Sequence, residues 1–331
     1  MLRSCQTNEN APQERTGMVS VVLPAYNEAD NIELAVSEIS KTLSGTGEEY
    51  ELVFISDGSK DGTYEKIQAA SAADPRVKGA EFSRNFGKEA AIFAGLSLAS
   101  GDAVIVMDCD LQHPVSVLPE MITKWKAGAE VVEGIKNSRG RESIFHKMSA
   151  GLFYGIMSKL IKIDMSSSSD FKLLDRKAVD ALLELPESNT FFRALTFWIG
   201  FRSDKVFYDV EERRNGKSKW TTKGLVKYAI SNATSFSTLP LRLITTMGWI
   251  FIVFAVVLGI QTLVKYFGGT SADGFTTVIL LLLIVGGFMM LSLGIAGHYI
   301  ARIYEEVKGR PRFIIRDTTE SLTGNLKGQW K

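Results

Sequence analysis

Two stretches of the chain contain no Asp, Glu, Lys or Arg, and they limit its architecture more than any other feature: Leu243–Val264 and Gly274–Ile300. A helix of about 20 apolar residues crosses the roughly 30 Å hydrocarbon core of a bilayer. A buried helix of a soluble protein can also lack charge, but two such runs joined by a short turn favour membrane spanning. We therefore expect two transmembrane helices, at about 243–265 and 275–300.

The flanking charges predict an orientation for these two spans. The turn between them holds one basic residue, Lys265, whereas several basic residues lie on their outer sides: Lys223, Lys227, Arg242, Arg302, Lys308, Arg310 and Arg312. By the positive-inside rule, the large N-terminal part and the C-terminal tail both face the cytoplasm. The first 17 residues are polar and do not resemble a signal peptide. We expect a multi-pass protein of the cell membrane.

Overall charge and cysteine content exclude some classes of protein. The 38 basic and 37 acidic residues leave a net charge of +1, which gives no indication of a nucleic-acid partner. The two cysteines, Cys5 and Cys109, lie far apart in different contexts, so a disulfide framework is not expected. This usage fits a reducing compartment.

The N-terminal part alternates short β-rich runs with amphipathic helical runs. Strands are predicted at Val19–Pro24, Glu51–Ser56, Val77–Phe82 and Asp102–Met107, with helices at Ala29–Leu43, Asp61–Ala73 and Gly87–Ser100. This βαβαβαβ order predicts an α/β fold with a largely parallel sheet and helices on both faces.

Polar residues follow each predicted strand, and the carboxyl ends of parallel strands meet at one crevice. Asp108, Asp110 and Gln112 follow the fourth strand, and Asp57 follows the second. Two carboxylates and an amide oxygen suit Mg²⁺ or Mn²⁺, with phosphate oxygens completing the ligand shell. The alternative for Asp-x-Asp alone is a solvated turn, but the neighbouring acidic strand end favours a metal–diphosphate site.

The sequence has neither a dinucleotide-binding GxGxxG motif nor a phosphate-binding GxxxxGK[ST] loop. Side chains and the metal must therefore hold the phosphates. Two basic segments are candidates, Ser83–Lys88 and Arg213–Trp220. The second segment is also compatible with a solvated basic hairpin attracted to anionic lipid headgroups.

Several motifs in order resemble one known family. They are PAYNE, SDGSKDGT, FSRNFGKEAAIFAGL, DAVIVMDCDLQHP, SDFKLLDRKAV, NTFFRALTFWIGF and RRNGKSKW, followed by the two apolar runs. Together they resemble the family 2 glycosyltransferases with a Rossmann-like GT-A domain that load a sugar onto polyprenyl phosphate. This group includes dolichyl-phosphate mannosyltransferases and bacterial bactoprenol glucosyl- and N-acetylglucosaminyltransferases. The resemblance extends from Val19 to about Ile315.

The resemblance and the patterns together suggest a domain organisation. A polar tail at 1–17 precedes a GT-A domain at 18–221, and the two spans fall within 239–300 before a cytoplasmic tail at 301–331. Residues 222–238 carry apolar positions beside lysines, which favours an amphipathic helix lying in the membrane interface. An ordinary packed surface helix is the alternative for that segment.

The resemblance also implies roles for individual residues. Asp110 and Asp170 are the implied catalytic residues, and Asp108, Asp110 and Gln112 the implied ligands of Mg²⁺ or Mn²⁺. The implied nucleotide-sugar pocket comprises Pro24, Ala25, Tyr26, Glu28, Asp57 and Asp108. The implied phosphate and acceptor contacts are Arg139, Arg141, Arg193, Arg213, Ser218 and Lys219.

The chain departs from the family pattern at three places. Ser169 replaces a usual glycine, and Cys109 replaces a usual alanine, which is tolerable if its side chain points into the sheet. After the fifth strand, members of the family tend to have arginines that bind the lipid phosphate. In this chain residues 136–147 contain several basic side chains, and the sequence leaves open which of them binds the lipid phosphate.

These observations lead to a functional hypothesis. The chain is expected to move a sugar, from UDP-glucose or UDP-N-acetylglucosamine, to undecaprenyl phosphate with inversion, giving a lipid-linked donor for cell-envelope glycans. By resemblance it forms a homo-oligomer such as a tetramer, in contact with membrane lipids. A membrane-anchored transferase with a soluble or glycan acceptor is the main alternative. A non-catalytic component of a sugar-lipid flippase is another.

Overall fold

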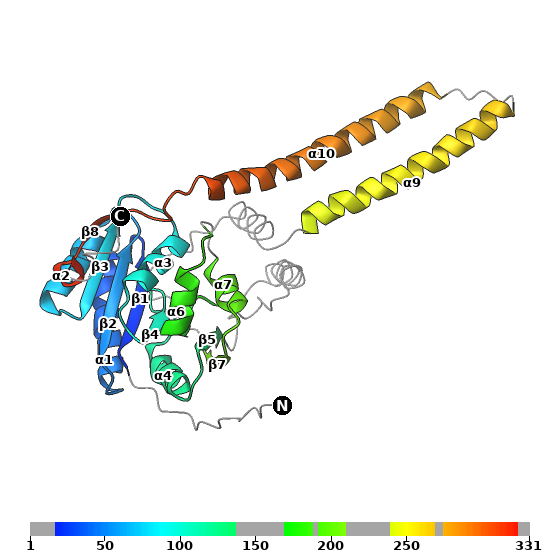
Figure 1. Cartoon of the computed structure of the whole chain (residues 1–331). Helices are drawn as coiled ribbons and strands as arrows, with labels where there is room; N and C mark the ends of the chain where they lie inside the picture. Colours follow the sequence, from blue (N-terminus) through cyan, green and yellow to red (C-terminus); the bar gives the residue numbers. More distant parts are fainter. Residues whose placement is uncertain (1–16, 137–168, 188–190, 210–238, 269–273, 324–331) are drawn as a thin grey trace, which may run out of the picture. The chain divides into compact units, whose positions relative to one another are not determined.

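The computed structural model describes residues 17–136, 169–187, 191–209, 239–268 and 274–323. The chain divides into two compact units. The first, here called the sheet unit, comprises 1–155, 163–219 and 311–331, and the second, the helical unit, comprises 156–162 and 220–310. Figure 1 shows the described elements coloured along the chain.

The described part of the sheet unit is built on an eight-stranded sheet with the order β7-β5-β6-β4-β1-β2-β3-β8. The strands are β1 (Val19–Ala25), β2 (Tyr50–Ser56), β3 (Val77–Phe82), β4 (Ala103–Val106), β5 (Val131–Lys136), β6 (Lys172–Asp175), β7 (Ser203–Tyr208) and β8 (Ile315–Thr318). β1 pairs in parallel with β2 and β4, and β2 pairs in parallel with β3. β6 and β8 run antiparallel to their neighbours. The predicted α/β class with a mostly parallel sheet is confirmed.

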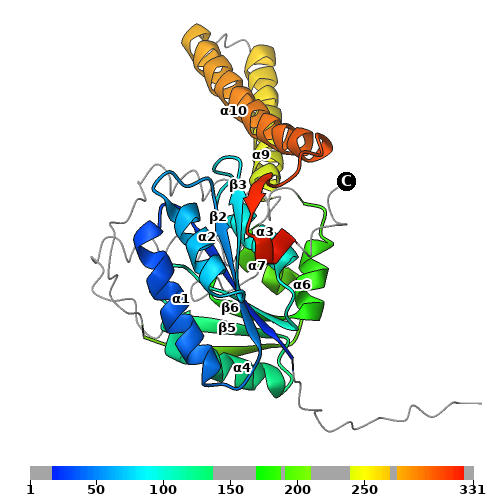
Figure 2. The same cartoon turned by 90° about the vertical axis from the view of Figure 1, so that its left-hand side faces the viewer.

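Helices cover both faces of this sheet, as predicted. They are α1 (Ala29–Ser44), α2 (Thr63–Ala73), α3 (Lys88–Leu98), a 3₁₀ turn η1 (Val115–Val117), α4 (Leu118–Lys126), α6 (Arg176–Leu183), α7 (Phe192–Trp198) and α11 (Glu320–Thr323). Figure 2 shows α1 and α2 on one face, with α3, α6 and α7 on the other. The predicted start of the second helix at Asp61 is two residues early, because the Asp61 carboxylate instead accepts a hydrogen bond from the Thr63 backbone amide.

The central strand β1 is apolar because it is covered on both faces. Val19, Val21 and Leu23 belong to the core cluster that includes residues of α1 and α4. Val22 points to the opposite face, where a Cβ on Gly95 of α3 would come within 2.1 Å of its Cγ1 atom. Strands buried on both sides have continuous apolar sequences rather than alternation. The glycine allows α3 to lie close against β1, and α3 begins at the polar crevice.

The C-terminal residues differ from the expected tail at 301–331. The second long helix continues to Val307, and β8 then pairs with β3 at the edge of the sheet. Leu322 beyond it is fully buried. Part of the segment predicted as a cytoplasmic tail is therefore an integral element of the sheet unit.

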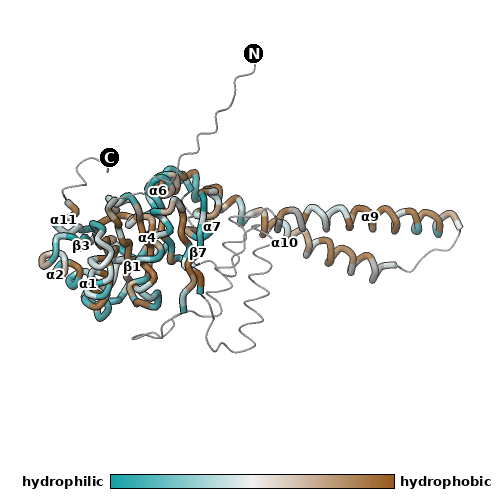
Figure 3. The backbone as a smooth tube through the Cα atoms, turned by 90° about the horizontal axis from the view of Figure 1, so that it is seen from below, coloured by the Kyte–Doolittle hydropathy of each residue, from teal (hydrophilic) through white to brown (hydrophobic). Residues whose placement is uncertain are grey.

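The helical unit contains α9 (Leu239–Phe267) and α10 (Phe275–Val307), which include the two predicted spans. Both are long and apolar enough to cross a membrane, with mean hydropathies of 2.3 over Ile244–Lys265 and 1.6 over Ile284–Val307. Figure 3 shows that apolar residues dominate along both helices. The ring of Phe251 on α9 lies 5.1 Å from that of Phe288 on α10, so the two helices pack against each other.

Gly58 is expected to tolerate no side chain, because a Cβ there would lie 2.5 Å from the Arg84 carbonyl carbon. Its φ of +62° adds strain for any L residue. Gly47 has a similar φ of +75°, but no neighbouring atom lies within 4 Å of the position that a Cβ would occupy, so it provides a matched control. Gly58→Ala should lower the free energy of unfolding by about 1–3 kcal/mol more than Gly47→Ala. Urea unfolding of both variants measures this difference, and equal losses would contradict the close approach.

Candidate active site

The carboxyl ends of β1, β2, β3 and β4 lie side by side, which brings together the polar residues predicted to share a crevice. The order β4-β1-β2-β3 follows from the parallel pairing. β2 and β3 follow on one side of β1, whereas β4 lies on its other side, so the direction of the strand order reverses between β1 and β4. Open α/β sheets bind ligands at such a reversal. The structure therefore supports one shared site at this edge.

Hydrogen bonds join the loop after β1 to the loop after β2 and to the first residue of α2. Asn27 adopts a left-handed φ of 55°, and its backbone amide donates to the Ser59 hydroxyl at 3.1 Å. The Glu28 amide donates to the Thr63 hydroxyl at 2.9 Å. Pro24 and Ala25 lie within β1, so the predicted strand end at Pro24 is one residue early, and the Ala25 side chain is buried in the core. Tyr26, with 40% of its surface exposed, is better placed than Ala25 to meet a ligand.

Asp57 at the end of β2 is buried and bonded to backbone. Its Oδ1 accepts from the Phe86 amide at 2.6 Å, and its Oδ2 accepts from the Gly87 amide at 2.9 Å. Burial raises the pKa of this carboxyl group above its usual value, although the two amide bonds act in the opposite direction. Asp57 thus fixes the loop Ser83–Lys88, and its predicted contact with the nucleoside stays a prediction.

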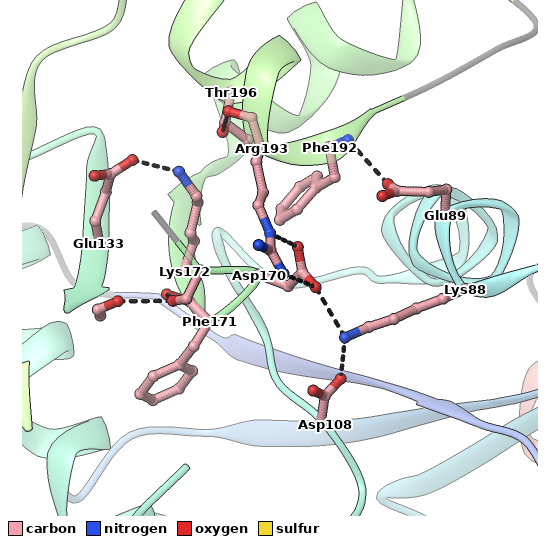
Figure 4. Close-up of polar contacts among 12 residues, drawn as sticks. Lys88, Glu89, Asp108, Glu133, Asp170, Phe171, Lys172, Phe192, Arg193 and Thr196 are labelled. Carbon is pink, nitrogen blue, oxygen red and sulfur yellow. Dashed lines mark hydrogen bonds and ion pairs between the residues drawn. The ribbon is translucent and has the colours of Figure 1, made fainter. Parts of the chain in front are cut away.

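A chain of alternating charges forms the centre of the site (Figure 4). The Lys88 ammonium lies between two carboxylates, 2.5 Å from Asp108 Oδ1 and 2.8 Å from Asp170 Oδ2. Burial alone would lower the pKa of Lys88, but the two carboxylates outweigh it and raise that pKa. The predicted residues Asp108 and Asp170 are therefore brought together through a lysine that the sequence placed only within a candidate phosphate-binding segment.

Arg193 binds the other side of Asp170 in a two-point contact. Its Nε lies 2.6 Å from Asp170 Oδ1, and its Nη2 lies 3.0 Å from Oδ2. Although burial favours the neutral form of Asp170, Lys88 and Arg193 hold its pKa below the usual range. An aspartate held ionised by two cations is a poor proton acceptor at neutral pH. Arg193, predicted on the acceptor side, contacts Asp170 directly.

Glu89 is a further, half-buried acid that sequence reasoning missed. Its Oε2 accepts a hydrogen bond from the Phe192 amide at 2.9 Å, which ties the start of α3 to the start of α7. Burial and then the charge of Asp170 raise the pKa of Glu89 to about 7. The only signal in the sequence is its position in FGKEAA, directly after Lys88.

Lys172 and Glu133 make a second buried ion pair beside this chain, as Figure 4 shows. The two residues face each other across the antiparallel pair β5 and β6. Lys172 is fully buried, and burial lowers the pKa of its ammonium although Glu133 counters this. Removing one partner of such a pair is costly, about 3–5 kcal/mol, so the pair helps to fix the strand that follows Asp170.

His113 holds the other oxygen of Asp108 and was also missed. Its Nε2 lies 3.6 Å from Asp108 Oδ2, and its Nδ1 lies 2.9 Å from the Tyr208 hydroxyl. The imidazole stacks on Phe171 with ring centroids 4.8 Å apart. The residue lies inside the motif DCDLQHP, so the signal was present, but Tyr208 belongs to β7 and Phe171 directly precedes β6.

The predicted metal ligands are oxygen donors at one turn. Asp110 Oδ1 accepts from the Gln112 amide at 3.1 Å, and Leu111 between them has a left-handed φ of 54°. Cys109 is 2% exposed and belongs to the core cluster, so its side chain points into the fold as required. No group of three His, Cys, Asp or Glu side chains in the described residues forms a ready-made metal cage. Two carboxylates and an amide suit a cation that keeps other oxygen ligands.

The remaining predicted contacts lie outside the described residues. These are Arg139, Arg141, Arg213, Ser218 and Lys219, together with the segment 222–238. Ser169 is one of the positions that depart from the family pattern. Its hydroxyl donates to the Gly134 carbonyl at 2.7 Å, which joins the segment before β6 to β5.

Comparison with known proteins agrees with this geometry. The model of glycosyl transferase family 2 matches residues 20–183. The Bacillus subtilis protein CsbB is 41% identical over 305 residues, covering 92% of this chain and 92% of that protein. The SfII prophage-derived bactoprenol glucosyl transferase of Shigella flexneri is 38% identical over 303 residues, covering 90% of this chain and 97% of that protein.

A solved structure shares the fold. It is glucosyl-3-phosphoglycerate synthase from Mycobacterium tuberculosis in complex with Mn²⁺, UDP and glucosyl-3-phosphoglycerate. It aligns with a TM-score of 0.50 and 23% identity over 66% of this chain and 80% of that chain. The family match and these relatives identify the chain as a glycosyltransferase, and its sheet unit has the GT-A type of fold. The chain belongs to glycosyl transferase family 2, and the two long helices follow its GT-A unit.

The raised pKa of Glu89 predicts a specific pH dependence of stability. Between its ordinary value of 4.5 and about 7, the folded state holds a proton that the unfolded state has released. Stability therefore falls as the pH rises through this window. Glu89→Gln keeps an oxygen for the Phe192 amide but cannot titrate. Its melting temperature should rise relative to the wild type between pH 5 and 7.5, and a constant difference would contradict the assignment.

Proposed function

We propose that the protein transfers glucose from UDP-glucose to undecaprenyl phosphate at the membrane surface, with inversion at the anomeric carbon. The similarity to a bactoprenol glucosyl transferase over 97% of that protein's length supports the acceptor and the sugar. UDP and Mn²⁺ bound to a protein of the same fold make a UDP-sugar and a divalent cation reasonable ligands for the strand-end site. The observation in the structure that carries the proposal is the charged chain Asp108–Lys88–Asp170–Arg193.

The acceptor explains why the site needs no strong base. A phosphate monoester has a second pKa of about 6, so it is largely dianionic at neutral pH and is already nucleophilic. Asp170, whose pKa is held below the usual range, is unsuited to removing a proton. It acts instead by holding Lys88 and Arg193 in position. A single in-line displacement then inverts the anomeric centre.

The donor requires stabilisation of its leaving diphosphate. Asp108, Asp110 and Gln112 are the residues that would hold Mg²⁺ or Mn²⁺, which supplies charge stabilisation for the departing phosphate oxygens. Lys88 lies against Asp108, and its side chain is 42% exposed, so we expect part of this side chain to meet an anionic ligand. His113 keeps the Asp108 carboxylate oriented.

The helical unit fits a lipid acceptor. Among the described side chains of the apolar segments of α9 and α10, none is buried, as expected for helices whose surface contacts lipid. We propose that both cross the cell membrane and that the sheet unit and both termini face the cytoplasm. Gly286, Gly287, Gly294 and Gly297 have open space around them, which permits close contact with other helices in a homo-oligomer.

A donor screen tests the reaction. Purified protein in detergent would be mixed with undecaprenyl phosphate, Mg²⁺ or Mn²⁺, and one radiolabelled nucleotide sugar at a time. We expect label from UDP-glucose to enter the lipid phase, and Asp110→Asn to lower the rate by about 100-fold or more. If label from UDP-N-acetylglucosamine enters the lipid phase instead, the transferred sugar is N-acetylglucosamine rather than glucose. Transfer only to soluble or glycan acceptors would overturn the lipid acceptor and favour the anchored transferase.

Removal of divalent cations tests the metal site separately. Treatment with EDTA should abolish transfer and weaken UDP binding, and added Mn²⁺ or Mg²⁺ should restore both. Asp108→Asn and Asp110→Asn should need higher metal concentrations for the same UDP binding, because each removes a charged oxygen ligand. Full activity in EDTA would exclude the proposed metal dependence.

A further inference from the structure

The segment that follows α10 returns to the sheet unit and pairs with β3. The register joins Ala80 to Thr318 and Phe82 to Ile315, with an irregularity between Glu81 and Phe82. Thr319 adds two bonds to Gly79, one from its amide and one to its hydroxyl, at 2.9 and 3.0 Å. The described part of this tail is therefore firmly attached to the strand that leads into the loop Ser83–Lys88.

The tail reaches this loop itself. The Ser83 amide donates to the Ile314 carbonyl at 3.0 Å, just where β3 ends. The Phe313 ring stacks on Phe82, with centroids 5.2 Å apart and planes inclined by 11°. Phe82 in turn contacts Phe86 edge-on, at 5.6 Å and 87°. Three rings thus connect the tail to the middle of the loop.

The loop touched by these rings carries three features of the proposed donor site. The Phe86 and Gly87 amides hold the Asp57 carboxylate. The loop backbone at Arg84 lies so close to Gly58 that a side chain there would collide with it. Lys88, directly after Gly87, contacts Asp108 and Asp170. A shift of Phe86 would therefore disturb both the end of β2 and the charged chain.

Arg312 joins the tail to α3 and to the residues that follow α6. The Arg312 guanidinium lies 5.0 Å from the ring centroid of Phe93 on α3, and its Nη2 donates to the Leu185 carbonyl. Arg312 and Phe313 therefore contact α3 and β3, the elements on either side of the loop Ser83–Lys88. The tail therefore supports the loop Ser83–Lys88 at both ends of that loop.

We propose that Phe313 is a positioning residue for the nucleoside diphosphate site. Through Phe82 and Phe86 it holds the loop Ser83–Lys88 in the conformation that keeps Asp57 bonded and Lys88 in the charged chain. This inference rests on the proposed function, because it assumes that the site binds a UDP-sugar. Loss of the Phe313 ring should weaken UDP binding and raise the KM for the donor more than it lowers kcat.

The experiment uses the full-length protein in detergent with Mn²⁺ and titrates UDP by calorimetry. Phe313→Ala should bind UDP roughly five- to tenfold more weakly than the wild type, the size expected for loss of an aromatic contact. Phe313→Tyr should restore binding, since it keeps the stacked ring. Ile314→Ala is the matched neighbour control, because its side chain is 52% exposed and its contact with Ser83 is through the backbone.

A further control separates positioning from general loss of stability. Ile39→Val removes a methylene group from the fully buried core at α1, away from the tail, and should lower stability without changing UDP affinity. If Phe313→Ala does not fold, Phe313→Leu keeps an apolar side chain while removing the stacking, and it should show the same weakening of UDP binding.

The outcomes distinguish this inference from the proposed function. Absence of UDP binding by the wild type would overturn the proposed function. Wild-type binding with unchanged affinity in Phe313→Ala and Phe313→Leu would overturn only the role of Phe313. An equal loss of affinity in Ile39→Val would also overturn it, because the effect would then follow stability rather than the position of the loop.

Discussion

The Lys88 ammonium between Asp108 and Asp170 is the contact on which the rest of the site depends. Asp108, Asp170 and Glu89 are three acidic groups gathered at one end of the sheet, and Lys88 and Arg193 are cations that contact the two aspartates. Burial, together with repulsion from Asp170 at Glu89 and from Asp108 at Asp170, would otherwise favour protonation of these acids. The two cations keep Asp108 and Asp170 ionised, and the remaining acid, Glu89, is the one whose pKa rises to about 7.

Much of this arrangement could be predicted from the sequence, because the apolar runs show where strands end. The four predicted strands match β1 to β4, with ends that differ by at most one residue. Parallel pairing then required Asp57 and Asp108 to share an edge. The pairing of Lys88 with Asp170 could not be predicted, because the two residues lie 82 positions apart and meet only when α3 packs closely on β1.

The C-terminal strand shows a different limit of sequence reasoning. β8 has the sequence IRDT, which is short and half charged, and such a run has little strand propensity of its own. It forms a strand because β3 would otherwise present an open edge, and covering an edge prevents unwanted pairing. A contact of this kind depends on the tertiary fold, so the sequence predicted only a cytoplasmic tail here. The same limit applies to His113, whose partner Tyr208 lies 95 positions further along the chain.

The differing exposure of the charged groups shows how anionic substrates can enter without dismantling the site. The Asp170 side chain is 8% exposed, whereas the Lys88 side chain, which it contacts, is 42% exposed. A phosphate can therefore approach the exposed part of the Lys88 side chain, while Asp170 holds the ammonium from the buried side. Arg193, at 28% exposure, is held in the same way from one side by Asp170. Because each cation is already oriented before a substrate arrives, little reorganisation is required when two anions are brought together, which is the main physical difficulty of this reaction.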